Sequence, residues 1–262
     1  MNRNHYFYFV LFIYMLIISI SGLNLRNKGT FTQHANTDSD QTEYSYTSDG
    51  FQSSENEPAK KEKLNVHIIP HTHDDLGWVK TIDEYYVGAN DTVENAYAGV
   101  QYILDGIYKA LMNDPTKKFT YVEIAFFSIW WDEQTDEVKD DVRMLVQEDR
   151  LQFVNGGWSM SDESSVYYED FINNMKKGHD FLNKTFGYKP TVGWQIDTFG
   201  HSNAALALFA EMGFEAWFFA RGDVQENEVR AQKKELEWIQ RPMYENLGNR
   251  TEIFSHWFYE YF

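Results

Sequence analysis

The feature that most constrains the fold is an alternation of strand-like and helix-like segments from residue 64 onward. Short apolar runs, such as the one around Val66 that ends at Pro70, are typical of buried strands. Longer stretches place apolar residues three and four positions apart, as an amphipathic helix does. We expect strands at 66–69, 120–127, 152–154, 191–196 and 215–220, and helices at 90–111, 138–146, 171–182 and 203–212. This alternation predicts an α/β fold with a parallel sheet and right-handed crossovers, either open or closed as a barrel.

The amino terminus has the pattern of a secretory signal peptide. Arg3 is followed by an uncharged apolar run over residues 6–18, and Ser19 and Ser21 then supply small residues before a cleavage site. We interpret 1–22 as a signal peptide. A retained membrane anchor is the alternative, although the run is short for a membrane span.

The next segment, 23–63, is polar and lacks periodicity, so it cannot bury enough apolar surface to offset the entropy of ordering. We predict that it is a disordered linker and that the folded domain covers 64–262. Asn-x-Ser/Thr sequons at Asn90, Asn183 and Asn249 are compatible with entry into the secretory pathway.

Charge and cysteine content exclude several classes of function. The chain has 23 basic and 40 acidic residues, a formal charge of −17, and no cysteine. A surface this acidic repels a nucleic-acid backbone or an anionic bilayer, so we expect no nucleic-acid partner and no membrane association after signal cleavage. Without cysteine the chain cannot form a disulfide scaffold, a zinc finger, an iron–sulfur cluster or a thiol nucleophile.

Two loops that follow predicted strands combine imidazole and carboxylate groups. The first reads Pro-His-Thr-His-Asp-Asp-Leu-Gly-Trp over 70–78, and the second reads Asp-Thr-Phe-Gly-His over 197–201. Such loops converge on a shared pocket, and alternate residues such as His73 and Asp75 can point the same way in an extended segment. Imidazole nitrogen and carboxylate oxygen suit zinc. The His-x-Asp tripeptide over 73–75 has alternative explanations: a surface loop with solvated charges, or an Asp that caps a helix.

Over its full length, the first loop resembles the zinc-binding loop of family 38 glycoside hydrolases, particularly the lysosomal α-mannosidases. The resemblance continues through 71–86, 99–105, 121–131, 155–158, 194–202 and 209–214, and so covers nearly everything from Leu64 to the end. It implies an α/β fold, specifically the seven-stranded parallel-sheet (β/α) barrel of this family, here incomplete. It also implies a zinc-dependent retaining α-mannosidase that hydrolyses terminal α-linked mannose from N-glycans and related oligosaccharides.

The same resemblance implies individual roles. His73, Asp75 and Asp197 look like ligands of one Zn²⁺, and Asp197 also looks like the catalytic nucleophile. Trp78, Phe199 and Arg221 match substrate-binding positions; ordinary core aromatics and an ion-paired arginine are the alternatives. A compartment such as the lysosome or vacuole, or the extracellular space, follows from the family and the signal peptide.

Other polar residues of these loops are left outside the predicted site. His71, Asp74 and His201 could support the ligands or be structural. Asp162 and Glu163 stand where the family has an acidic pair, but a solvated loop carboxylate is the commoner outcome.

The sequence also departs from the family. The general acid/base and the fourth protein ligand to zinc are expected beyond this chain, so we expect the 262-residue chain alone to be unstable or inactive. Thr198 stands where the family usually has proline. The alternatives are a non-catalytic carbohydrate-binding or degenerate paralogue and, with a poorer fit, a metal-dependent deacetylase.

Overall fold

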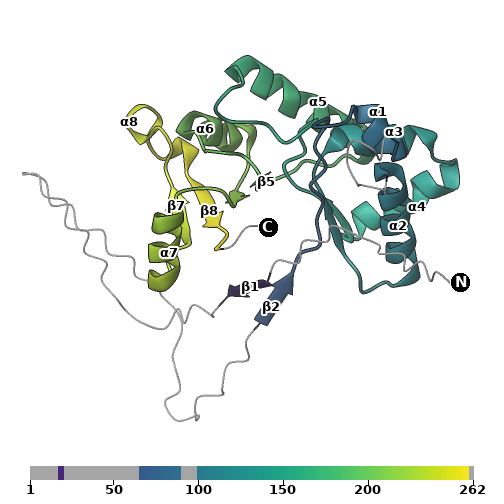
Figure 1. The fold of residues 1–262 in the computed structure, drawn as a ribbon, viewed down its shortest axis with the longest axis horizontal. Coiled ribbons are helices and arrows are strands. Elements are labelled where there is room, and N and C mark those ends of the chain that lie inside the picture. Colours follow the sequence, from purple (N-terminus) through teal and green to yellow (C-terminus); the bar gives the residue numbers. More distant parts are fainter. Residues whose placement is uncertain (1–16, 21–64, 90–98, 260–262) are drawn as a thin grey trace, which may run out of the picture. The chain divides into compact units, whose positions relative to one another are not determined.

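The computed structural model describes residues 17–20, 65–89 and 99–259, which fall into two compact units (Figure 1). The smaller unit pairs β1 (Ile17–Ile20) with β2 (Asn65–Ile68) in antiparallel orientation, with Ile17 opposite Ile68. Strand β2 confirms the strand expected after residue 64. The rest of the predicted signal peptide and the predicted linker over 23–63 lie outside the described residues, and both stay predictions.

The larger unit carries the remaining strands. Strand β3 (Phe119–Tyr121) pairs in parallel with β4 (Leu151–Phe153). A four-stranded sheet has the order β5-β6-β8-β7, with bounds Val192–Gln195, Ala216–Phe219, Ile253–Trp257 and Glu237–Gln240. The β5-β6 pair is parallel, as predicted. Strands β7 and β8 were not predicted; β8 is parallel to β6, and β7 lies antiparallel to β8. The sheet is therefore mixed, and the predicted seven-stranded barrel is not confirmed.

Backbone hydrogen bonds join these pieces edge to edge beyond the strands themselves. The Thr120 amide donates to the Pro70 carbonyl at 2.9 Å, and His71 forms a parallel bridge with Thr120. On the other side of this pair, the Asn155 amide donates to the Val192 carbonyl at 2.7 Å. The segment after β2 is thus bonded to β3, and the segment after β4 is bonded to β5. The two polar loops follow β2 and β5.

Helices fill the intervals between strands. They are α1 (Ile82–Val87), α2 (Val100–Asn113), α3 (Ile124–Glu133), α4 (Asp136–Gln147), α5 (Tyr168–Phe186), α6 (Asn203–Met212), α7 (Val224–Lys233), α8 (Tyr244–Leu247) and the 3₁₀ helix η1 (Gly248–Thr251). The predicted helices near 138–146, 171–182 and 203–212 are confirmed, and the described part of 90–111 lies in α2. None of the helices among the described residues is long and apolar enough to cross a membrane.

One predicted strand is wrong in most of its length. We expected a strand over 120–127, but β3 ends at Tyr121 and α3 begins at Ile124. Helix α3 is buried nearly all around, including Phe126, Phe127 and Trp130. A helix buried on every side shows no 3.6-residue alternation, so its apolar run has the same appearance as a buried strand.

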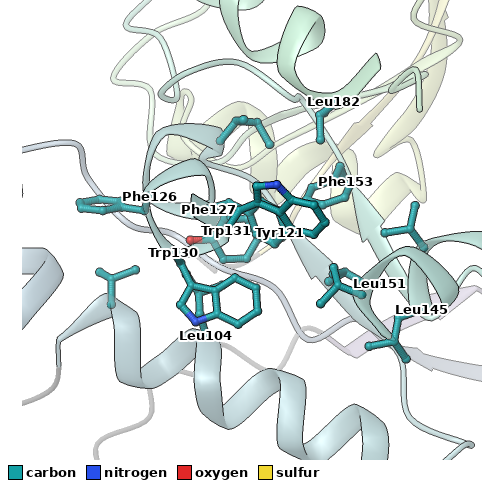
Figure 2. Close-up of a cluster of buried hydrophobic side chains, with 14 of the residues drawn as sticks. Leu104, Tyr121, Phe126, Phe127, Trp130, Trp131, Leu145, Leu151, Phe153 and Leu182 are labelled. Carbon is teal, nitrogen blue, oxygen red and sulfur yellow. The ribbon is translucent and has the colours of Figure 1, made fainter. Parts of the chain in front are cut away.

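Two apolar clusters stabilise the larger unit. The first surrounds α3, and Figure 2 shows side chains of this cluster, Phe127, Trp131 and Phe153 among them. The Phe127 ring lies 5.0 Å from that of Phe153 in an edge-on arrangement, and Phe127 is 1% exposed. The second cluster joins α5 and α6 to the four-stranded sheet through Phe209, Trp217 and Trp257. The helices and strands that flank the two polar loops are therefore packed in apolar clusters.

Candidate metal centre

The loop after β2 is held by its neighbours before it presents any functional group. The Thr72 amide donates to the Thr120 carbonyl at 3.3 Å, which ties the start of the loop to β3. Gly77 then turns the chain with φ of 81°, a value that side chains disfavour. Thr81 caps α1 in a reciprocal capping box with Glu84, which fixes where the loop ends.

His73 on this loop meets both predicted carboxylate partners. Its Nε2 lies 3.2 Å from Oδ2 of Asp197 and 3.4 Å from Oδ1 of Asp75. One ligand atom from each of the three residues lies within 4.8 Å of the other two. Asp197 follows β5, so the structure brings together groups that are 124 positions apart in the chain.

The donor set fits a zinc ion. Ligand atoms at roughly 2.0–2.2 Å from a tetrahedral zinc lie about 3.4 Å from one another, and the two distances from His73 are 3.4 and 3.2 Å. Two carboxylates and one imidazole are also the ligand types that zinc accepts. A cation placed among them would offset the repulsion between Asp75 and Asp197.

Arg221 extends this cluster on the side of Asp197. Its Nε donates to Oδ1 of Asp197 at 2.8 Å, and a terminal guanidinium nitrogen approaches the same oxygen. The guanidinium carbon also lies 4.9 Å from the centre of the Phe199 ring. The two oxygens of Asp197 therefore face different groups, His73 on one side and Arg221 on the other.

The two predicted aromatic side chains are both exposed to solvent. Trp78 is 72% exposed and Phe199 is 77% exposed. Within the described part of the chain, no hydrogen bond, ion pair or ring contact joins Trp78 to the other predicted site residues. Five of the six predicted residues are thus connected, and the indole of the sixth stands in solvent on the loop that carries Asp75.

Two further acids lie close to His73, and of these Glu123 is buried and Asp74 is partly buried. Thr72 Oγ1 donates to Oε2 of Glu123 at 3.1 Å, and Oε1 of Glu123 lies 3.9 Å from Nδ1 of His73. Burial raises the pKa of Glu123 well above its ordinary value, and the charge of Asp74 adds to the shift. Burial also raises the pKa of Asp74 to about 6, opposed by the nearby His73.

Sequence reasoning missed Glu123, although a signal existed. It lies within the run Tyr-Val-Glu-Ile over 121–124, where a glutamate among apolar side chains is unusual. Buried carboxylates occur rarely unless another group pairs with them. The predicted strand over 120–127 concealed the signal, because alternation along a strand could place this residue on a solvated face.

A second buried network corrects the expectation for Glu163. We expected a solvated loop carboxylate, but Glu163 is buried and accepts hydrogen bonds from Gln195 at 3.2 Å and from the Ser202 amide at 2.7 Å. Its Oε1 also lies 3.0 Å from Nδ1 of His201, and the other ring nitrogen of His201 lies 2.9 Å from the Arg221 carbonyl. The Glu163 carboxylate lies among Gln195, at the end of β5, and His201 and Ser202, which follow that strand. His201 therefore contacts the backbone of Arg221, the residue whose side chain binds Asp197.

The sequence of this chain is similar to those of proteins named α-mannosidases. The chain is 51% identical over 180 residues to a protein named lysosomal alpha-mannosidase from Homo sapiens, covering 68% of this chain and 18% of that protein. It is 49% identical over 178 residues to a protein of the same name from Dictyostelium discoideum, covering 68% and 17%. The chain therefore spans less than a fifth of the length of these two relatives.

The structure of an α-mannosidase from Enterococcus faecalis has a similar fold. Its TM-score is 0.56 with 18% sequence identity, and the match covers 74% of this chain and 20% of that one. Residues 63–262 match the family described as glycosyl hydrolases family 38 N-terminal domain. Since the matched region includes both polar loops and most of the chain, the chain belongs to glycosyl hydrolase family 38.

Proposed function

We propose that this chain is part of a zinc-dependent retaining α-mannosidase in which Asp197 is the nucleophile. One observation carries the proposal. The Asp197 carboxylate joins the His73–Asp75 pair through Oδ2 and accepts from Arg221 through Oδ1. The similarity to proteins named lysosomal alpha-mannosidase supports mannose as the substrate sugar.

We assign the metal to His73, Asp75 and Asp197. Three protein ligands leave positions on a zinc ion for exogenous groups, as in catalytic rather than structural zinc sites. When bound, the ion would contribute Lewis-acid contacts to sugar hydroxyls and so help to fix the ring. The open side of the cluster, near Phe199, offers the sugar access to these positions.

The chain's own residues then provide the first bond-forming step. A carboxylate oxygen of Asp197 attacks the anomeric carbon, and the bond from that carbon to the leaving oxygen breaks with its electron pair going to the leaving group. Arg221 holds the carboxylate in place through its guanidinium. With a natural glycoside, a second carboxylate has to protonate the leaving oxygen, and water later releases the sugar.

The exposed aromatic side chains would bind the substrate. The Phe199 ring lies against the Arg221 guanidinium, which supplies hydrogen-bond donors, and the exposed indole of Trp78 is on the loop that carries Asp75. We propose a mannose-terminated oligosaccharide, including N-glycans, as the substrate class. The names of the relatives, together with the predicted signal peptide, favour the secretory pathway and the lysosome, vacuole or extracellular space.

A single-turnover experiment tests the nucleophile. An aryl α-mannoside with a dinitrophenolate leaving group needs no protonation to depart, so the chain can be tested for the first step alone. Because turnover needs a second carboxylate, we expect no catalytic cycle; in zinc-containing buffer one mannosyl unit should stay attached per folded chain by intact mass, on the peptide that contains Asp197. Asp197→Asn should abolish labelling, and Asp162→Asn, in a loop carboxylate bonded to Ser164 and Ser165, should leave it unchanged.

Two results would contradict this assignment. Labelling that persists in the Asp197→Asn variant would place the nucleophile elsewhere. Mannose binding by calorimetry without any labelling would instead support the non-catalytic carbohydrate-binding alternative.

A further inference from the structure

Beyond the proposed ligands, the position of Glu123 behind His73 has no role assigned so far. The two ring nitrogens of His73 face different acids: Nε2 points into the group formed with Asp75 and Asp197, and Nδ1 faces Glu123. Glu123 is 1% exposed, and its Oε1 makes no hydrogen bond of normal length within the described part of the chain. A carboxylate oxygen buried without such a bond is costly unless another group uses it.

The other half of this carboxyl group is fixed. The Val122 amide donates to Oγ1 of Thr72 at 3.0 Å, and that hydroxyl donates in turn to Oε2 of Glu123 at 3.1 Å. Both functions of the Thr72 hydroxyl are therefore used. This short chain of bonds fixes Glu123 from one side and leaves Oε1 directed at the imidazole.

We infer that Glu123 is a positioning residue that accepts a hydrogen bond from Nδ1–H of His73 and thereby presents Nε2 to the metal. The inference rests on the proposed metal site. An imidazole that binds zinc through one nitrogen carries its proton on the other, and a carboxylate partner there fixes both the tautomer and the ring orientation. The present separation of 3.9 Å exceeds a hydrogen bond by about 1 Å, a gap that a small rotation of either side chain closes.

Zinc affinity of the full 262-residue chain tests this role. A chromophoric chelator competes for Zn²⁺, and the variants are Glu123→Gln, Thr72→Val and Thr72→Ser. We expect Glu123→Gln to weaken zinc binding roughly 10- to 100-fold. Thr72→Val should weaken it less, and Thr72→Ser, which keeps the hydroxyl, should retain wild-type affinity.

A matched control separates this effect from the general loss of an acid. Asp105→Asn removes a carboxylate that accepts from the Trp130 indole at 3.0 Å and joins α2 to α3. It should leave zinc affinity unchanged. Near-ultraviolet circular dichroism gives the folded fraction of each variant, and affinities are compared per folded chain.

Nitrogen NMR of the histidine rings shows which ring nitrogen carries the proton. A purely structural role of Glu123 would not change this property of His73. In the zinc-loaded wild type we expect the His73 ring to carry its proton on Nδ1, with a strongly downfield proton shift that Glu123→Gln reduces. The His73→Gln variant identifies the signal.

The outcomes separate the two proposals. If the wild type binds zinc and Glu123→Gln binds it equally well, or if Nδ1 of His73 is the metal ligand, the role of Glu123 is overturned while the metal site stands. If the wild type binds no zinc, the metal site fails, and the role of Glu123 fails with it.

Discussion

The two sides of the candidate metal centre differ in how far their side chains are exposed to solvent. The buried side consists of Thr72 and Glu123, which are packed behind His73 and joined by hydrogen bonds. On the open side we propose Trp78 and Phe199, whose rings are mostly in solvent. We call these the buried support and the aromatic rim.

This difference indicates a division of labour. Buried groups lose their water on folding, so removing one partner leaves an unpaired polar atom or a cavity. Exposed rings contribute little to folding, because they remain in water whether or not the chain folds. Changes to the buried support and to the apolar core should therefore lower stability and weaken metal binding. Changes to the aromatic rim should weaken only the binding of the sugar.

The largest expected contrast comes from two identical truncations. Phe127→Ala removes a ring that is 1% exposed at the centre of the α3 cluster and should lower the free energy of unfolding by roughly 3–5 kcal/mol. Phe199→Ala on the rim should change it by less than about 0.5 kcal/mol. Urea unfolding followed by tryptophan fluorescence measures both. Comparable losses would contradict the division between buried and exposed sides.

A smaller effect is expected when the rim alone is altered. Trp78→Ala in the zinc-loaded chain should weaken binding of methyl α-mannoside by about 1 kcal/mol, since an aromatic contact contributes roughly 0.5–1.5 kcal/mol. The free energy of unfolding should stay unchanged. NMR titration measures the affinity, and Tyr102→Ala, at an exposed ring on α2, is the matched control. Equal weakening in both variants would mean that Trp78 has no specific role.

The smallest effect concerns pH and His179, a partly buried histidine of α5 that lies outside the buried support. Burial lowers the pKa of His179, while its contact with the Asn155 carbonyl at 2.9 Å opposes the shift. As the pH falls below about 6.5, the unfolded chain takes up this proton before the folded chain does, so stability decreases. His179→Gln should lose less stability than the wild type between pH 7.5 and about 5.5.

Urea unfolding at a series of pH values measures this dependence. His67→Gln is the control, because His67 is exposed and the variant should follow the wild type. An unchanged pH dependence in His179→Gln would show that another group controls acid stability.

Much of the fold could be predicted from local signals. Helix α6 was predicted with its observed bounds, because Gly213, with φ of 91°, ends it. The structure adds that the Ser202 side chain caps its start. The antiparallel orientation of β7 carries no such local mark, since strand direction depends on which neighbour a strand pairs with. The run over 120–127 was misread because burial on all sides removes the periodicity that distinguishes a helix from a strand.

The site shows the same division between local and long-range information. Alternate spacing and the family resemblance brought His73, Asp75 and Asp197 to attention, and the structure places them together. Glu123 and Glu163 were not selected, because their importance lies in contacts with residues distant in the sequence. Burial decides whether a carboxylate is solvated or structural, and only the tertiary structure determines burial.

Location of the zinc ion is the most direct test of the central claim, that His73, Asp75 and Asp197 form one metal site. Crystals of the zinc-loaded chain, measured on both sides of the zinc absorption edge, would place the ion by its anomalous signal. We predict one strong peak roughly 2.0–2.2 Å from Nε2 of His73 and from a carboxylate oxygen of each aspartate. Zinc bound elsewhere, or no peak at these three residues in the folded, zinc-saturated chain, would contradict the account.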